Sequence, residues 1–375
     1  MSMDVKEYKC PECGGALEWN SSLQKLKCPY CDSVFSMEEF EGPEASESSA
    51  DDFEGDGAVT QVEMSSDAEN FNWESSENVF NAQETAGMKV YSCQSCGAEI
   101  VADETLGATT CPYCGNNIVM TGQFAGDLRP DYIIPFKLDK EAAKAKLREH
   151  VRSQKYVPKV FQDENHIDEI KGMYVPFWLF DATCHVDQIY NCTRVRTWMT
   201  GEMQYTRTAH YKVRREGTMK FAHVPVDASK TMPDDLMESL EPYNFQDAVP
   251  FKTGYLAGYL ADKYDVKAED CIAKADSRIQ KTATGAFRDS VTGYSSVNQA
   301  AQRLSFQEGK TSYALYPVWI LNTSWNGEKY LFAMNGQTGK FIGNLPLDQK
   351  AWTKSWILMG AVIAIVLYAI MWFMA

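Results

Sequence analysis

Eight of the eleven cysteines fall in four Cys-x-x-Cys pairs, and this arrangement constrains the chain more than any other feature. The pairs form two sets with the same internal spacing, because fourteen residues separate the two pairs in each set. Every cysteine of the second set lies 83 residues after its equivalent in the first. The two sets are Cys10, Cys13, Cys28 and Cys31, and then Cys93, Cys96, Cys111 and Cys114. Chance does not produce such a repeat, so the sequence predicts two copies of one small module.

Each Cys-x-x-Cys segment predicts a tight turn that directs two thiolates at one metal ion. Two such turns complete a tetrahedron of sulfur with no open position, so we expect two structural ions and no catalytic metal. Gly14, Gly97 and Gly115 follow second cysteines, where the left-handed backbone is favoured, and Asp32 fills the same place in the remaining turn. Short Cys₄ spacing is typical of Zn²⁺; iron, which similar turns bind in rubredoxins, is the alternative.

The net charge of −15 is concentrated in one stretch. Residues 41–88 contain thirteen Asp or Glu and no Lys or Arg, so the rest of the chain carries only −15 + 13 = −2. This composition predicts an acidic disordered linker over 41–88, between a first ribbon at 1–40 and a second at 89–122. Its apolar residues could form a partner-docking motif; they are Phe71, Trp73, Val79 and Phe80. The charge balance excludes a basic, nucleic-acid-binding footprint along the whole chain.

The C-terminus is apolar. Twenty residues from Trp356 to Ala375 have no formally charged side chain, which is the length of one bilayer crossing as a helix. Lys350 and Lys354 precede this run and no basic residue follows it. The sequence therefore predicts a transmembrane helix at 355–375 and a single-pass protein of the cell membrane, with its N-terminal body in the cytoplasm.

The region 123–348 is predicted to be an α+β body. The expected helices are Asp139–Gln154 and Asp265–Arg288, and the expected strands are Met173–Tyr190, Arg194–Val226 and Tyr313–Trp325, the last followed by a hairpin turn at Asn326-Gly327. Tyr174–Phe180 resembles Leu315–Leu321, which suggests two related halves. Trp178 and Trp319, at matching places in the two segments, are expected to be core residues.

Residues typical of catalysis do not form a recognisable motif. Gly309-Lys310-Thr311 resembles the end of a phosphate-binding loop, but Leu304 stands where the first glycine should be, and a helix end and turn are expected there instead. Cys184 and His185 are neighbours in a predicted strand, so their side chains should point to opposite faces. Cys192 and Cys271 are expected to be small buried residues. We therefore predict that the protein is not an enzyme.

A basic group within the predicted strands leaves two alternatives open. It comprises Arg194, Arg196, Arg207, Lys212, Arg214 and Arg215, with Tyr205 and Tyr211 interleaved. These residues could form a nucleic-acid-binding sheet face. A solvated sheet edge, or a face attracted to anionic lipid headgroups, is the plainer interpretation.

The whole chain resembles a family of membrane-anchored double zinc-ribbon proteins of Gram-positive bacteria, which are often encoded near flotillin-like (SPFH) and phage-shock-type (PspA) membrane-stress proteins. The resemblance rests on the Cys-Pro-x-Cys turns, Tyr174–Trp178, Tyr316–Trp319, Phe332–Lys340 and the apolar C-terminus. The two modules also resemble ribbons of transcription initiation factor B (TFIIB-type) and of the primosomal helicase. These resemblances imply a scaffold that uses its ribbons to recruit protein partners to the membrane, SPFH- or PspA-like proteins among them. A membrane-tethered nucleic-acid-binding protein is the alternative function.

Overall fold

The structure is a computed structural model that describes residues 9–40, 73–75, 78–80, 88–93, 95–103, 111–113, 119–123, 128–158, 161, 169–343 and 345–374. Most of the predicted acidic linker, 41–88, lies outside these residues, so the prediction that it is disordered remains a prediction.

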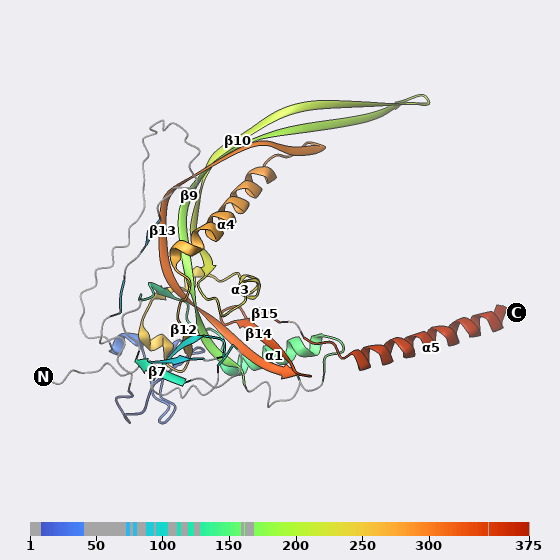
Figure 1. Cartoon of the computed structure of the whole chain (residues 1–375). Helices are drawn as coiled ribbons and strands as arrows, with labels where there is room; N and C mark the ends of the chain where they lie inside the picture. Colours follow the sequence, from blue (N-terminus) through green and yellow to red (C-terminus); the bar gives the residue numbers. More distant parts are fainter. Residues whose placement is uncertain are drawn as a thin grey trace.

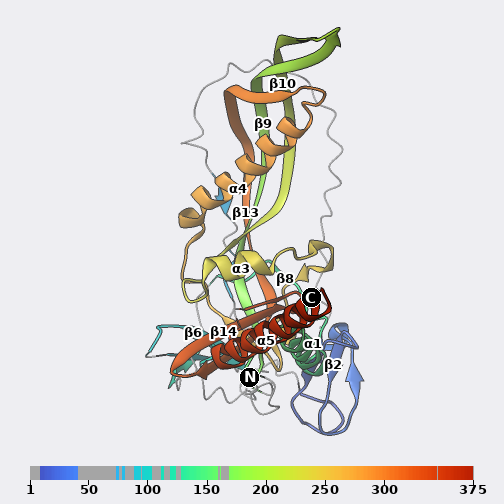
Figure 2. The same cartoon turned by 90° about the vertical axis from the view of Figure 1, so that its right-hand side faces the viewer.

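Three long strands form the central part of the main sheet (Figure 1). β9 (Lys171–Thr200) lies between β10 (Met203–Asp227) and β13 (Ser296–Trp325) and pairs with both in antiparallel register. The sequence is rich in β-branched and aromatic residues here, which favours strands. The three predicted strands are confirmed with different bounds: β9 and β13 are longer than expected, and β10 begins at Met203 instead of Arg194 because β9 continues to Thr200. Together they make a curved ribbon that extends far beyond the rest of the molecule (Figures 1 and 2).

The shorter strands pair with the lower part of this sheet. β8 (Tyr132–Ile133), β11 (Val249–Pro250) and β12 (Leu260–Asp262) join it, and so do β5 (Met88–Ser92), β6 (Glu99–Asp103) and β7 (Val119–Gln123). β4 (Glu74–Ser75) pairs with β13. β14 (Glu328–Asn335) follows β13 through Asn326 and Gly327, both with positive φ, and β15 (Phe341–Ile342) pairs with β14. The predicted hairpin is therefore confirmed.

Both predicted helices of the body are confirmed. α1 (Lys140–Ser153) begins after Asp139, whose carboxylate accepts a hydrogen bond from the Ala142 amide at 2.8 Å and so caps the helix. α4 (Ala268–Asp289) buries a stripe of mostly small apolar residues against β9 and β10, and these are Ala268, Cys271, Ala275, Ile279 and Ala283. A third helix, α3 (Asp234–Leu240), and the short turns η4 (Phe245–Asp247) and η5 (Thr253–Leu256) complete this part.

The two repeated segments of the body pair with each other. Tyr174 lies opposite Pro317 and Pro176 lies opposite Leu315, where β9 and β13 run side by side. Trp178 and Trp319 are both buried, as expected. The indole Nε1 of Trp178 donates to the Val266 carbonyl at 2.9 Å, and that of Trp319 donates to the Leu138 carbonyl at 3.1 Å. The resemblance between the halves thus corresponds to matching places in one shared core.

The predicted fold class was wrong. Strand is the commonest element among the described residues, most of it in one large sheet, whereas α+β with a transmembrane helix was expected. No helix of the described chain has both the length and the apolar character needed to cross a bilayer. α5 (Gln349–Met374) does form, but its first turns hold Gln349, Lys350 and Lys354.

The prediction of a transmembrane helix at 355–375 was therefore wrong, and so was the prediction of a single-pass protein of the cell membrane.

Candidate metal centres and their surroundings

The first four cysteines of the repeat come together in space. Cys10, Cys13, Cys28 and Cys31 place all four Sγ atoms within 4.8 Å of one another. Two of the sulfur pairs, Cys10 with Cys31 and Cys13 with Cys28, are each 3.5 Å apart. Four sulfurs around Zn²⁺ at ~2.3 Å would be roughly 3.8 Å apart, so this cluster fits a tetrahedral ion with only a small adjustment.

The backbone turns that carry these cysteines share one geometry. In the first turn, the amide of Cys10 donates to the carbonyl of Gly15, and the amide of Gly14 donates back to the carbonyl of Cys10. The turn at Cys28 repeats this pattern with Ser33 and Asp32, and the turn at Cys93 repeats it with Ala98 and Gly97. Gly14, Asp32 and Gly97 have φ values of 73°, 61° and 80°, which confirms the left-handed conformation expected at these three places. Gly115 lies outside the described residues.

Two charged or polar neighbours support the first cluster. Hydrogen bonding to Ser33, through its hydroxyl first and its backbone second, lowers the pKa of the Cys31 thiol to about 6. Asp32 forms an ion pair with Lys27 at 2.7 Å, and that interaction lowers the pKa of the Asp32 carboxyl. Cys10 and Cys28 are buried, whereas Cys13 and Cys31 are exposed.

The second cluster has three described members. Cys93, Cys96 and Cys111 also lie within 4.8 Å of one another, with Cys96 and Cys111 at 3.7 Å. Cys114, the expected fourth ligand, lies outside the described residues. Both clusters could therefore hold a metal ion, and the donor set is all thiolate in each.

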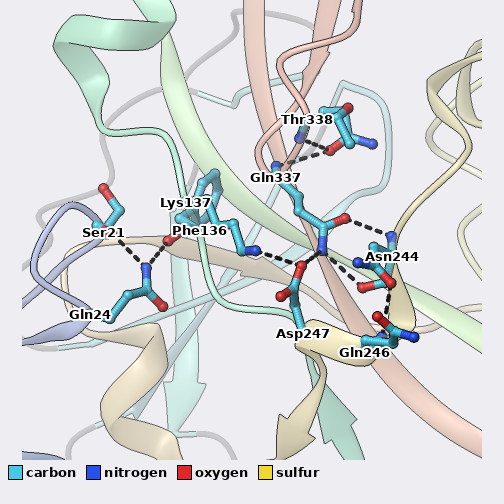
Figure 3. Close-up of polar contacts among 10 residues, drawn as sticks. Ser21, Gln24, Phe136, Lys137, Asn244, Gln246, Asp247, Gln337 and Thr338 are labelled. Carbon is cyan, nitrogen blue, oxygen red and sulfur yellow. Dashed lines mark hydrogen bonds and ion pairs between the residues drawn. The ribbon is translucent and has the colours of Figure 1, made fainter.

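The two clusters sit in different structural settings. The first belongs to a separate three-stranded sheet of β1 (Glu18–Asn20), β2 (Lys25–Lys27) and β3 (Val34–Phe35), followed by the turn η1 (Met37–Phe40). This sheet packs on the body through the buried Trp19, whose ring lies 4.6 Å from that of Tyr255 and whose amide donates to the Ala257 carbonyl. Gln24 Nε2 also donates to the Phe136 carbonyl at 2.8 Å (Figure 3). By contrast, strands β5, β6 and β7 of the second module are part of the main sheet, joined to β12 through β6.

A buried polar group ties the second module to the body. Tyr113, between Cys111 and Cys114 in the sequence, donates its hydroxyl hydrogen to the carboxylate of Asp262 in β12. Ser229 Oγ donates to the same carboxylate oxygen at 2.7 Å. Asn322 Nδ2 donates to the Tyr113 carbonyl. Burial raises the pKa of Asp262 to about 7, because the low-dielectric interior disfavours the charged carboxylate.

The equivalent tyrosine of the first module has the opposite environment. Tyr30 occupies the place of Tyr113, and it is 77 % exposed where Tyr113 is 6 % exposed. Its ring lies over Gly15, where a Cβ would come within 2.5 Å of it. Leu23 and Val34 of the same module are also exposed. Sequence reasoning missed this difference because the two turns read alike; the acidic and serine partners of Tyr113 lie more than a hundred residues away.

Two aromatic residues of the acidic stretch pack on the chain's own body. Trp73 is buried with its ring 5.1 Å from that of Phe180, and Phe80 lies 5.7 Å from Phe251. Thr311 Oγ1 donates to the Glu74 carbonyl at 3.0 Å, beside the parallel pairing of β4 with β13. Phe71, the other aromatic residue of the expected docking motif, lies outside the described residues.

The glycine-rich motif Asn335–Gly339 has a structural role. Gln337 is buried; its side-chain oxygen accepts from the Asn244 amide at 2.8 Å, and its side-chain nitrogen donates to the Asn244 carbonyl and to the carboxylate of Asp247 (Figure 3). Lys137 forms an ion pair with the same Asp247 oxygen at 2.6 Å. The motif therefore joins β14 to the loop before β11.

The residues considered for catalysis are separated. Cys184 is buried under α4, and His185 lies on the opposite, open face of β9, as expected from strand alternation. Cys192 and Cys271 are buried, which confirms that prediction. The expectation of a helix end and turn at Gly309-Lys310-Thr311 was wrong, because these residues lie within β13 beside a bulge, where the register with β9 shifts between Gln307 and Lys310.

Comparison with known proteins gives one informative relative. No family model matches the chain, and no solved structure matches it. The chain is 31 % identical over 333 residues to "Uncharacterized protein YdjG" of Bacillus subtilis (strain 168), a match that covers 75 % of this chain and 97 % of that protein. At this identity and coverage, the chain belongs to the same protein family as Bacillus subtilis YdjG.

Proposed function

We propose that this protein is a non-enzymatic adaptor in which zinc ribbons create rigid surfaces and the first ribbon recruits a protein partner. One observation carries the proposal: the Tyr30 turn is presented to solvent, while its equivalent at Tyr113 is used to build the body. Tyr30, Leu23 and Val34 expose 77 %, 52 % and 40 % of their surfaces on this one small module. Aromatic residues of this kind are enriched at protein interfaces.

The first module needs an ion to act as a rigid surface. Its three strands contain only three, three and two residues, which is too small a core to fold unaided. We infer that the ion is Zn²⁺ at both clusters, in TFIIB-type ribbons, with Cys114 as the fourth ligand of the second. Four thiolates leave no open position, which supports a structural role.

Elemental analysis of the purified chain tests this assignment. We expect two zinc ions per chain and a colourless protein. Iron in the same sites would give a visible absorption band and would overturn the choice of metal. A chain with Cys114→Ser should retain a single tightly bound ion.

The partner is expected among SPFH- or flotillin-like and PspA-like proteins of the same organism, following the family resemblance of the sequence. The test measures binding of the zinc-loaded chain to such purified proteins. Tyr30→Ala should weaken binding at least tenfold, while the control Glu38→Gln, an exposed change in η1 of the same module, should leave it unchanged. Equal binding by the wild type and Tyr30→Ala would contradict recruitment through the first ribbon.

Charge argues against the ribbon-based alternative, in which the first module binds nucleic acid. Between residues 9 and 40 there are three Lys and five Asp or Glu, a balance of 3 − 5 = −2. A phosphate backbone would be repelled by such a surface. Positive charge is concentrated elsewhere, on the long hairpin.

A further inference from the structure

The outer end of the β9–β10 hairpin is a two-stranded arm. β13 accompanies β9 only as far as the pair Ser296 and Thr193, so residues 194–209 are paired with each other alone. α4 ends at Asp289, and the arm continues well past it (Figures 1 and 2). The described side chains of the arm are exposed or nearly so. The face of the hairpin that α4 covers farther down is therefore open to solvent along the arm.

The arm is basic in an acidic chain. The arm and the residues at its base, 193–212, carry four Arg or Lys and one Glu, a balance of 4 − 1 = +3, against −15 for the whole protein. Three of those positive charges lie on the same face as α4, since Arg194, Arg196 and Arg207 share the register of the buried residues of β9. The fourth, Lys212, pairs with Asn191 on the opposite face.

Aromatic rings lie on that same face. Trp198 and Tyr205 are directly opposite each other, with ring centroids 5.8 Å apart and ring planes at 15°, and they are 48 % and 42 % exposed. At the base of the arm, the Arg194 guanidinium lies 5.6 Å from the ring of Tyr211 and 5.5 Å from that of Tyr294. The other face carries none of these groups; Thr197 and Thr206 meet there instead.

One pair of residues on this face is electrostatically unfavourable. Arg196 and Arg207 are directly opposite each other, and like charges at such cross-strand positions are destabilising. Among the ion pairs formed by described residues, the carboxylates of Asp187 and Glu216 pair with Arg214 and not with Arg196 or Arg207. An anionic ligand lying across the two guanidiniums would remove the repulsion.

We propose that this face of the arm binds single-stranded nucleic acid, with Arg196 and Arg207 on phosphates and the Trp198–Tyr205 pair stacking on a base. Rows of side chains repeat every second residue along a strand, ~6.8 Å apart, so an extended single strand can place phosphates and bases on successive rows. Every base offers a π-face, which predicts weak dependence on sequence.

A bilayer surface suits the arm less well. The apex would meet the headgroups first, and it contains Gly201 and the acidic Glu202, which anionic lipid would repel. The arginines and aromatic rings are instead spread along the length of one face.

The test is titration of the full chain into a labelled 20-nucleotide oligo-dT or oligo-rU, followed by fluorescence anisotropy at low and moderate salt. Arg196→Gln with Arg207→Gln should weaken binding at least tenfold and reduce the salt slope by about 1.4, because a single strand contributes ~0.7 per phosphate contact. Trp198→Ala should weaken binding by about 5- to 150-fold. Lys212→Gln, which removes one positive charge from the opposite face, is the matched control for Arg196→Gln and should change binding less than threefold.

Three outcomes would overturn the proposal. The first is no binding to either oligonucleotide at low salt. The second is equal weakening by Lys212→Gln and Arg196→Gln, which would indicate a diffuse charge effect. The third is arm-dependent binding to phosphatidylglycerol vesicles without binding to oligonucleotides, which would assign the face to a lipid surface. Circular dichroism of each variant checks that these exposed changes leave the fold intact. Tyr30→Ala should bind oligonucleotides normally, so the result is independent of the proposed ribbon partner.

Discussion

Tyr113 and Asp262 form a buried hydrogen bond between the second cysteine cluster and the main sheet, although 149 residues separate them in the sequence. The bond places a residue from inside a Cys-x-x-Cys turn within the interior of the body. The second module is therefore part of the main sheet, whereas the first forms a separate sheet whose buried Trp19 packs on Tyr255 of the body.

Substitution of the two equivalent tyrosines tests this difference. Tyr113→Phe removes the hydroxyl that the Asp262 carboxylate accepts from and should lower the free energy of unfolding by about 1–3 kcal/mol. Tyr30→Phe removes an exposed hydroxyl and should change it by less than about 0.5 kcal/mol. Urea unfolding of the zinc-loaded chain measures both. Equal effects would show that the buried bond contributes nothing particular.

The raised pKa of Asp262 predicts a pH dependence of stability. Burial raises the pKa from about 3.9 in an unfolded chain to about 7, so between these values the folded state holds a proton that the unfolded state has lost. The contribution to stability is fully present below about pH 4 and is lost as the pH rises through about 7. Asp262→Asn keeps an oxygen acceptor but cannot titrate.

Melting temperatures of the wild type and Asp262→Asn at pH 5.5 and pH 8 provide the measurement. We expect the melting temperature of the wild type minus that of Asp262→Asn to be higher at pH 5.5 than at pH 8. Effects of pH on the cysteine clusters occur in both proteins and cancel in this difference. A difference that does not change with pH would mean that Asp262 has an ordinary pKa in the folded state.

Local features of the sequence were predicted well. The positive φ values at Gly14, Asp32 and Gly97, and the cap at Asp139, depend on a few adjacent residues, so the sequence contains all the information needed. The pairing of cysteines into clusters followed from their repeat. Trp178 and Trp319 could be placed in the core because their surroundings are repeated.

Long-range features were predicted poorly, for a physical reason. The partners of Tyr113 lie in β12 and in the segment after β10, and no local pattern connects them. Gly309 reads as a turn because glycine and lysine are common there, but the register with β9 makes it a bulge within a strand. The length of uncharged sequence near the C-terminus suggested a bilayer crossing, but no described helix has both the length and the apolar character that a crossing needs.

The setting of each cluster predicts how far the loss of a ligand spreads. Cys28→Ser removes a ligand from the separate three-stranded sheet, so faster hydrogen exchange should be confined to residues 9–40. Cys93→Ser removes one from a module whose strands belong to the main sheet, so faster exchange should extend into β6 and β12. Hydrogen exchange followed by mass spectrometry resolves these segments. Spread of the Cys28→Ser effect into β9 would contradict the separation of the first module.

Two glycines provide a matched test of packing in the body. A Cβ at Gly336 would come within 2.7 Å of the Phe136 ring and 2.9 Å of Pro317 Cβ, both in the core. Gly336→Ala should therefore lower the free energy of unfolding by about 1–3 kcal/mol through overpacking. Gly285, inside α4, has open space around its missing Cβ, so Gly285→Ala should raise stability by about 0.5–1 kcal/mol. Urea unfolding of the two variants measures both signs, and stabilisation by Gly336→Ala would show that the motif after β14 is loosely packed.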